Sequence, residues 1–247
     1  MRIGIIGAGQ VGATLARKLS DARHSVLLAN SRSPASIAEI AEEAGARAVT
    51  VDAAVRDTDV VIIAIPERSI PLLRKRLVDG IPDHLIVVDA GNYYPSAGEA
   101  PIAAIENGMP ESQWVAQQLG KPVVKAFNTM LANSLGTKGK PAGEDGRIAL
   151  PVSGDGPGDK KIVIDLIDAV GFDGIDAGSL AESWRQQPGN PACCSDLQAD
   201  GLRLALSRAD RTTAPHLRDL ILQKIGQLRD VPTFEDLISI NRAVHGL

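Results

Sequence analysis

Three glycines near the amino terminus have the spacing G-x-G-x-x-G. The segment reads Gly7, Ala8, Gly9, Gln10, Val11 and Gly12. It follows an apolar run at residues 2–6 and opens a stretch with helical spacing of apolar residues, the context in which this spacing indicates a dinucleotide site. The first glycine permits a tight turn, the second lets backbone N–H groups approach a pyrophosphate, and the third lets helix and strand pack closely. The alternative is a tight strand–helix turn that binds nothing.

The end of the next predicted strand indicates which nucleotide is bound. A dinucleotide site usually carries, about twenty residues after the glycines, an acid for the ribose 2′-hydroxyl. Here the segment is Asn30, Ser31 and Arg32, with no carboxylate. A hydroxyl and a guanidinium can instead donate hydrogen bonds to a 2′-phosphate, the second of them charge-assisted. We therefore predict NADP(H) rather than NAD, the alternative being a solvated arginine beside a helix cap.

Three further segments follow predicted strands, where a doubly wound sheet binds its ligands. They are Ile65 and Pro66, then Ala90, Gly91 and Asn92, and last Lys125 with Asn128. Proline and glycine at these places can shape the backbone against a flat nicotinamide ring, although ordinary turns use the same residues. Lys125 and Asn128 are the candidate catalytic residues, but they span a strand end and should not share a helical face.

No other catalytic constellation is apparent in the sequence. We find no Ser-His-Asp order, no Cys-His pairing and no close carboxylate pair. The four histidines have no metal-ligand spacing, so no metal site is predicted. A hydride that passes between two bound rings needs proximity and orientation rather than a strong protein acid or base. The sequence therefore favours ring-to-ring hydride transfer.

The order of predicted elements indicates an α/β fold with a Rossmann-type, doubly wound, mostly parallel sheet. Predicted strands occupy residues 2–6, 25–29, 47–51, 59–65, 85–89 and 122–126, and predicted helices occupy residues 11–19, 35–44 and 70–77. A glycine-rich loop is expected at 136–146 and a strand–helix–strand unit at 147–176, with helices after residue 195. We expect an NADP-binding domain at 1–120 and a smaller, acceptor-binding α/β and helical part at 121–247, which can share the same sheet.

Composition narrows the class of protein. The 247 residues carry a net charge of −4, which gives no long-range reason to bind nucleic acid or an anionic membrane. No apolar run approaches the ~20 residues of a membrane-spanning helix. The two cysteines are adjacent. We expect no signal peptide, because the first predicted strand begins at Arg2 and cleavage there would remove the glycine loop. We expect a cytoplasmic homodimer that binds no nucleic acid and no membrane.

Several of these segments together resemble the NADP oxidoreductase family that reduces the deazaflavin coenzyme F420. The resemblance covers most of the chain and rests on residues 7–12, 30–32, 60–66, 89–92, 123–129, 151–155 and 176–180. Residues 125–129 are also similar to the reductase domain of the six-transmembrane metalloreductases, which use a flavin. The resemblance implies that Ser31 and Arg32 hold the 2′-phosphate and that the acceptor ring stacks over nicotinamide. Residues 184–191 and the helical tail are additional to the deazaflavin enzymes and could reshape the acceptor pocket.

The expected function is hydride transfer between NADP(H) and a ring acceptor, either coenzyme F420 or a flavin such as FMN or FAD. Two alternatives remain. One is an NADP-dependent dehydrogenase or imine reductase acting on a small substrate, for which Lys125 is the one proton donor that the sequence offers. The other is a binding protein that senses NADP without turnover.

Overall fold

The centre of the molecule is a parallel sheet of six strands in the order β3-β2-β1-β4-β5-β6. The computed structural model describes residues 1–73, 82–95, 101–228 and 230–247. The strands are β1 (Arg2–Ile6), β2 (Ser25–Ala29), β3 (Arg47–Ala48), β4 (Val60–Ile63), β5 (Ile86–Asp89) and β6 (Val124–Lys125). This order confirms the predicted Rossmann-type fold. It reverses between β1 and β4, where such sheets bind ligands beyond the strands' carboxyl ends.

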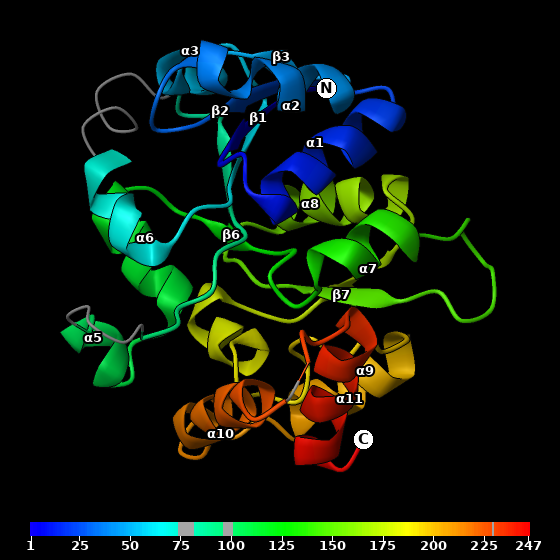
Figure 1. The fold of residues 1–247 in the computed structure, drawn as a ribbon. Coiled ribbons are helices and arrows are strands. Elements are labelled where there is room, and N and C mark those ends of the chain that lie inside the picture. Colours follow the sequence, from blue (N-terminus) through cyan, green and yellow to red (C-terminus); the bar gives the residue numbers. More distant parts are fainter. Residues whose placement is uncertain (74–81, 96–100, 229) are drawn as a thin grey trace.

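Helices cover both faces of this sheet (Figure 1). On one face lie α1 (Gln10–Asp21), α2 (Ala38–Glu43), α7 (Ala132–Thr137) and α8 (Pro157–Ala169). On the other lie α3 (Val51–Arg56), α5 (Ala103–Glu106) and α6 (Glu111–Leu119). Successive strand side chains alternate between the two cores, so Val60 packs in the first and Val61 in the second. Burial on both faces explains why the strands are almost continuously apolar.

A second, two-stranded parallel sheet continues the fold. Its strands are β7 (Ala149–Val152) and β8 (Asp173–Asp176), and α8 connects them. Lys125 of β6 exchanges two backbone hydrogen bonds with Ser153, of 2.8 and 3.0 Å, in an antiparallel bridge. This bridge joins the two sheets beside the carboxyl end of the large one.

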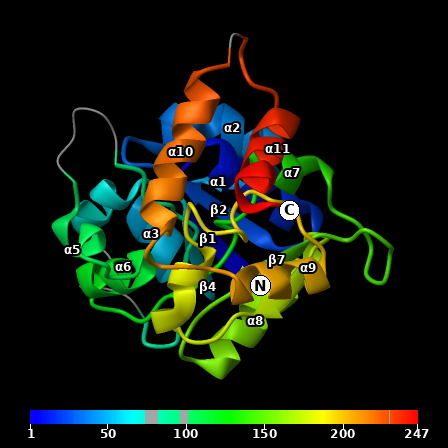
Figure 2. The same cartoon turned by 90° about the horizontal axis from the view of Figure 1, so that it is seen from below.

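The carboxyl-terminal helices lie at the end of the molecule opposite α2 and α3 (Figure 1). They are α9 (Ala199–Ser207), α10 (Ala214–Gly226) and α11 (Phe234–His245). The view from below shows α10 and α11 side by side (Figure 2), and their residues are in contact. None of the helices in the described ranges is long and apolar enough to cross a bilayer.

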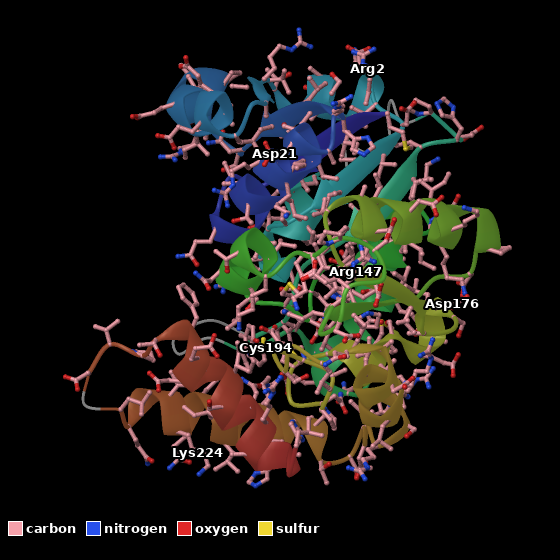
Figure 3. All side chains as sticks on the ribbon, turned by 90° about the vertical axis from the view of Figure 1, so that its right-hand side faces the viewer. Arg2, Asp21, Arg147, Asp176, Cys194 and Lys224 are labelled. Carbon is pink, nitrogen blue, oxygen red and sulfur yellow. The ribbon has the colours of Figure 1, made fainter. Side chains whose placement is uncertain are left out.

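The two cysteines lie in the interior. Cys193 and Cys194 are both buried, and their Sγ atoms are 3.6 Å apart without a disulfide. Figure 3 shows Cys194 where the helical tail meets the α/β part of the chain. Both cysteines thus act as small buried side chains that pack between the helical tail and the rest of the chain.

Four predicted segments differ from the structure. Residues 34–43 form a 3₁₀ turn, η1 (Pro34–Ile37), followed by the short α2, in place of one helix. The strand predicted at 47–51 ends at Ala48, because the Thr50 hydroxyl caps α3 by accepting a hydrogen bond from the Ala53 N–H. The loop predicted at 136–146 begins inside α7. Of the helix predicted at 70–77, residues 70–73 are helical and the rest lies outside the described residues.

Candidate nucleotide and acceptor site

The three glycines of the loop after β1 and the first turn of α1 differ in their surroundings. Gly7 has φ of +120°, and a Cβ there would also overlap the Ala64 carbonyl. A Cβ on Gly12 would overlap the Gly7 carbonyl, so this glycine allows helix and strand to approach. A Cβ on Gly9 would meet nothing within 4 Å. Gly9 therefore has no packing requirement, and its open face leaves the backbone accessible to a ligand at the start of α1.

The segment after β2 borders the same cavity as the glycine loop. This cavity, of about 660 Å³, is lined by Gly7, Ala8 and Gly9 on one side and by Asn30, Ser31 and Arg32 on another. The Asn30 side chain fixes the turn, since its Oδ1 accepts from the Arg32 N–H at 3.0 Å and its Nδ2 donates to Ser36 Oγ at 2.9 Å. Arg32 is exposed and makes no ion pair with any described residue. Its guanidinium is thus free to bind an anion.

A second cavity, of about 420 Å³, continues the first toward β5. Both are lined by Ala64, Ile65 and Pro66, which form the shared wall after β4. The second cavity also meets Val11, Ala90, Gly91 and Asn92, and ends at the aromatic side chains of Tyr93 and Tyr94. The residues that the sequence selected after β2, β4 and β5 therefore line one continuous cleft, whereas Lys125 and Asn128 after β6 do not line it. Gln10 precedes Val11 at the start of α1 and lines neither part.

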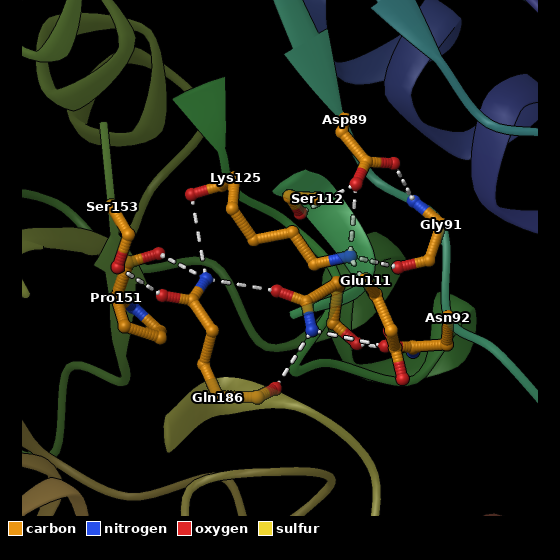
Figure 4. A network of polar contacts seen from close by, with 10 residues as sticks. Asp89, Gly91, Asn92, Glu111, Ser112, Lys125, Pro151, Ser153 and Gln186 are labelled. Atoms are coloured by element: carbon orange, nitrogen blue, oxygen red, sulfur yellow. Dashed lines mark hydrogen bonds and ion pairs between the residues drawn. The ribbon is translucent and has the colours of Figure 1, made fainter. Parts of the chain in front are cut away.

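Asn92 and Asn128 bond to each other in this structure. Asn92 Nδ2 donates to the Asn128 carbonyl at 2.8 Å, and Asn128 Nδ2 donates to Asn92 Oδ1 at 3.0 Å. Gln186, at the end of the 3₁₀ helix η3 (Leu180–Gln186), completes the network, because its Nε2 donates to Asn128 Oδ1 at 3.0 Å and its Oε1 accepts from Ser153 Oγ (Figure 4). Asn128 is 3% exposed. Its amide is occupied within the protein, whereas Asn92 reaches the cavity wall.

Lys125 is fully buried, within a cluster of acids (Figure 4). Its Nζ donates to Asp89 Oδ2 at 3.1 Å and to the Gly91 carbonyl at 2.6 Å, and lies 3.7 Å from Glu111 Oε2. Asp89 and Lys125 are direct partners in the β5–β6 register. Asp89 also accepts from Ser112 Oγ at 2.6 Å and from the Gly91 N–H at 3.0 Å. The cluster thereby fixes the backbone of the Ala90–Asn92 turn that lines the cleft.

Glu67, in the 3₁₀ turn η2 (Glu67–Ser69), adds a third carboxyl to this cluster. Burial and the neighbouring Glu111 raise the pKa of Glu67 to about 8, although Lys125 opposes the shift. Burial also raises the pKa of Glu111. For Lys125, burial works to lower the pKa, and Asp89, Glu111 and Glu67 outweigh it, so the pKa is raised. The ammonium stays charged at neutral pH while Glu67 is mostly protonated.

No close carboxylate pair is apparent in the sequence, but the structure brings three carboxyl groups together. Asp89, Glu67 and Glu111 are distant in sequence and converge only through the sheet register and the docking of α6. The sequence contained one indication of this cluster. Asp89 and Lys125 place opposite charges at the ends of two successive apolar strands, where burial of an unpaired charge would be energetically unfavourable. Glu67, Glu111 and Gln186 carry no comparable signal. Among the described residues, no group of three or more histidine, cysteine, aspartate or glutamate side chains could hold a metal ion.

The exposed guanidinium of Arg32 gives a direct test of nucleotide choice. Replacing Arg32 by alanine should weaken NADPH binding about ten- to a hundredfold, because a charge-assisted hydrogen bond contributes about 1.5–3 kcal/mol. NADH affinity should hardly change, since NADH lacks the 2′-phosphate. Calorimetric titration of both nucleotides measures the effect, and Arg56→Ala, on the exposed end of α3, is a matched control. Equal losses for both nucleotides would refute the assignment.

The fold and the cleft define a Rossmann-type nucleotide-binding protein, and comparison with known proteins gives its family. Residues 2–93 match the model of the family described as NADP oxidoreductase, coenzyme F420-dependent. The chain belongs to this family and is an NADP-dependent oxidoreductase.

Individual relatives extend the similarity beyond the matched segment. The chain is 36% identical over 105 residues to protein YjhV of Escherichia coli (strain K12), which covers 42% of this chain and 77% of that protein. The crystal structure of protein SMa0349 from Sinorhizobium meliloti is 33% identical, with a TM-score of 0.67 over 81% of this chain and 96% of that one. A candidate F420-dependent NADP reductase from Arthrobacter sp. FB24 shares the fold at 22% identity, with a TM-score of 0.63 over 92% and 94% of the two chains.

Proposed function

We propose that this protein transfers a hydride between NADP(H) and a ring acceptor, coenzyme F420 or a flavin, in the cleft beyond the carboxyl ends of β2, β1, β4 and β5. The main support is the continuity of the cleft. It runs from the glycine loop and Arg32, past Ile65 and Pro66, to a chamber that ends at Tyr93 and Tyr94. When bound, the nicotinamide supplies the hydride. The protein's own residues would bind the phosphates and form the cleft wall at Ile65 and Pro66. Tyr93 and Tyr94 would present aromatic surface to a planar acceptor.

The residues that line the nucleotide side of the cleft position the reactants. The open face of Gly9 and the first turn of α1 would hold the pyrophosphate, and Ser31 with Arg32 the 2′-phosphate. The turn Ala90–Asn92 is held by Asp89 and Lys125 on its buried side. We propose that Lys125 and Asn128 act through this support, because neither side chain lines the cleft.

One observation favours a second candidate function, the reduction of a small carbonyl or imine substrate. Such a reaction requires a proton donor beside the nicotinamide. Glu67 lines the 420 Å³ cavity, and its pKa of about 8 keeps it mostly protonated at neutral pH. The imine reductase of Pseudomonas sp. shares the fold at 14% identity, with a TM-score of 0.50 over 91% of this chain and 75% of that one.

A turnover panel separates the two candidates. Purified protein with NADPH is offered coenzyme F420, FMN, FAD and a set of ketones and cyclic imines, and loss of the reduced-nicotinamide absorbance is followed. We expect oxidation of NADPH with a ring acceptor. Oxidation only with ketones or imines would support the second candidate, and no oxidation with any of them would support an NADP-sensing protein.

We also propose separate roles for the two parts of the chain. Residues 1–120 would bind the nucleotide, and residues 121–247 would form the acceptor side from outside the 420 Å³ cavity, whose lining residues all lie in 1–120, with the protein acting as a cytoplasmic homodimer. The exposed apolar side chains near the α10–α11 connection, Leu222, Leu228, Val231 and Phe234, support a protein contact there. The mass measured by light scattering in solution tests the dimer.

A further inference from the structure

The buried acid cluster has more negative charge than its single cation can balance. Among the described residues, Lys125 is the only cation that pairs with Asp89 or Glu111, and both acidic side chains are at most 3% exposed. Glu67 is 4% exposed and faces the same group. Three ionised carboxylates with one ammonium would bury two net negative charges. Because burying uncompensated charge is very unfavourable, the cluster retains protons.

The position of Glu67 sets it apart from the other two acids. A Cβ on Gly91 would lie 2.6 Å from Glu67 Oε1 and 3.2 Å from Asp89 Oδ1, so both oxygens flank the bare face of this glycine. Within the described part of the chain, Glu67 Oε1 is buried and has no hydrogen-bond partner. Of the three acids, only Glu67 lines the cavity bounded by Pro66, Gly91 and Asn92. Its carboxyl therefore has hydrogen-bonding capacity left for a ligand in that cavity.

We propose that Glu67 is the proton donor of the hydride-transfer reaction, acting on an acceptor bound in the cavity that it lines. This inference rests on the proposed function. The acceptor gains a hydride from NADPH and the proton of the Glu67 carboxyl, which yields the reduced acceptor, NADP⁺ and the Glu67 carboxylate. Glu67 then regains a proton from solvent, so the net reaction consumes one proton and transfers two electrons.

The groups around Glu67 make this proton transferable near neutral pH. Glu111 from α6 and Asp89 from β5 disfavour the carboxylate, and Lys125 from β6 favours it. Tyr94 also faces this group, and burial raises its pKa well above 10, so it stays protonated. Glu67 has a pKa of about 8, close to the working pH at which a general acid is most effective.

Proton release on nucleotide binding tests the proposal without turnover. The oxidised nicotinamide ring is cationic and the reduced ring is neutral. A cation close to Glu67 should lower its pKa by roughly 1–3 units, so binding of NADP⁺ at pH 7 should release about 0.4–0.9 of a proton. NADPH should release less, and it carries the same 2′-phosphate, which makes it the internal control. Calorimetry in buffers of different ionisation enthalpy measures the released protons.

Two variants decide the source of the released proton. In Glu67→Gln the difference between NADP⁺ and NADPH should vanish while both nucleotides still bind. In Glu111→Gln one negative neighbour is removed, so the difference should persist and its maximum should move to lower pH. With the best acceptor of the turnover panel, Glu67→Gln should also lose roughly 10²–10⁴-fold in kcat/KM together with the basic limb near pH 8.

The outcomes separate this proposal from the proposed function. Equal proton release for NADP⁺ and NADPH by the wild type, or an unchanged difference in Glu67→Gln, would overturn the role of Glu67 while NADP binding stands. Failure of the wild type to bind either nucleotide would overturn the proposed function itself.

Discussion

Replacing Gly9 by valine should abolish measurable NADPH binding without unfolding the protein. A side chain at this position meets nothing in the protein within 4 Å, so the free energy of unfolding should remain close to that of the wild type. The same side chain would occupy the space through which a pyrophosphate reaches the N–H groups of α1. Loss of two such charge-assisted hydrogen bonds corresponds to roughly 10²–10⁴-fold in affinity.

The neighbouring glycine gives the contrast for this experiment. Gly12→Ala should lower the melting temperature, because its Cβ would overlap the Gly7 carbonyl between β1 and α1. Calorimetric titration with NADPH and thermal unfolding of both variants provide the comparison. A Gly9→Val protein that binds NADPH like the wild type would mean that the phosphates bind elsewhere.

Replacing Lys125 by methionine should destabilise the fold by roughly 3–5 kcal/mol, because it leaves buried acids without their cation. Protonation of Glu111, whose pKa is already raised by burial, would remove part of the uncompensated charge, so the loss should be smaller at pH 5 than at pH 8. Lys161→Met is the matched control, since Lys161 forms an exposed i,i+4 pair with Asp165 and should cost at most about 0.5 kcal/mol. Urea unfolding at both pH values measures the difference.

The size of this loss tests whether Lys125 forms an ionised buried cluster with the acids around it. A loss below about 1 kcal/mol at pH 8 would contradict an ionised cluster, because removal of one partner of a buried pair is strongly destabilising. The same buried position explains why turnover of a Lys125 variant alone cannot identify a proton donor: the lysine supports the Ala90–Asn92 turn from behind.

The protonation of Glu67 also makes the free energy of unfolding depend on pH. Its pKa of about 8 in the folded protein lies above the ordinary value of 4.5, so the folded state binds more protons between these values. The stability contribution of Glu67 is therefore fully present below about pH 4.5 and is lost as the pH rises through 8. The Glu67→Gln variant should lack this part of the pH dependence, which the same urea measurements record.

The parallel sheet and the glycine loop could be predicted because their signals are local. Each buried strand is a short apolar run, and the glycine spacing occurs directly between a strand and a helix. The residues at the strand ends were predictable for the same reason, since parallel strands bring their carboxyl ends to one edge. Chain order alone thus places Arg32, Pro66 and Asn92 along one cleft.

The acid cluster could not be predicted in the same way. Glu111 lies on a helix that no periodicity marked, and Glu67 lies in a single 3₁₀ turn after β4. Gln186 reaches Asn128 across 58 residues of sequence. Phe127, buried with φ of +64°, turns the chain after β6 in a conformation that non-glycine residues rarely adopt. These contacts depend on tertiary packing, for which the sequence has no local pattern.

Difference electron density of NADP⁺ bound to the wild-type protein tests the central claim most directly. We expect the 2′-phosphate beside Arg32, the pyrophosphate over Gly9, and the nicotinamide between Pro66 and Asn92 with Glu67 in the adjoining wall. Nicotinamide density outside the 420 Å³ cavity, or a nucleotide bound away from the Gly7–Gly12 loop, would contradict the account.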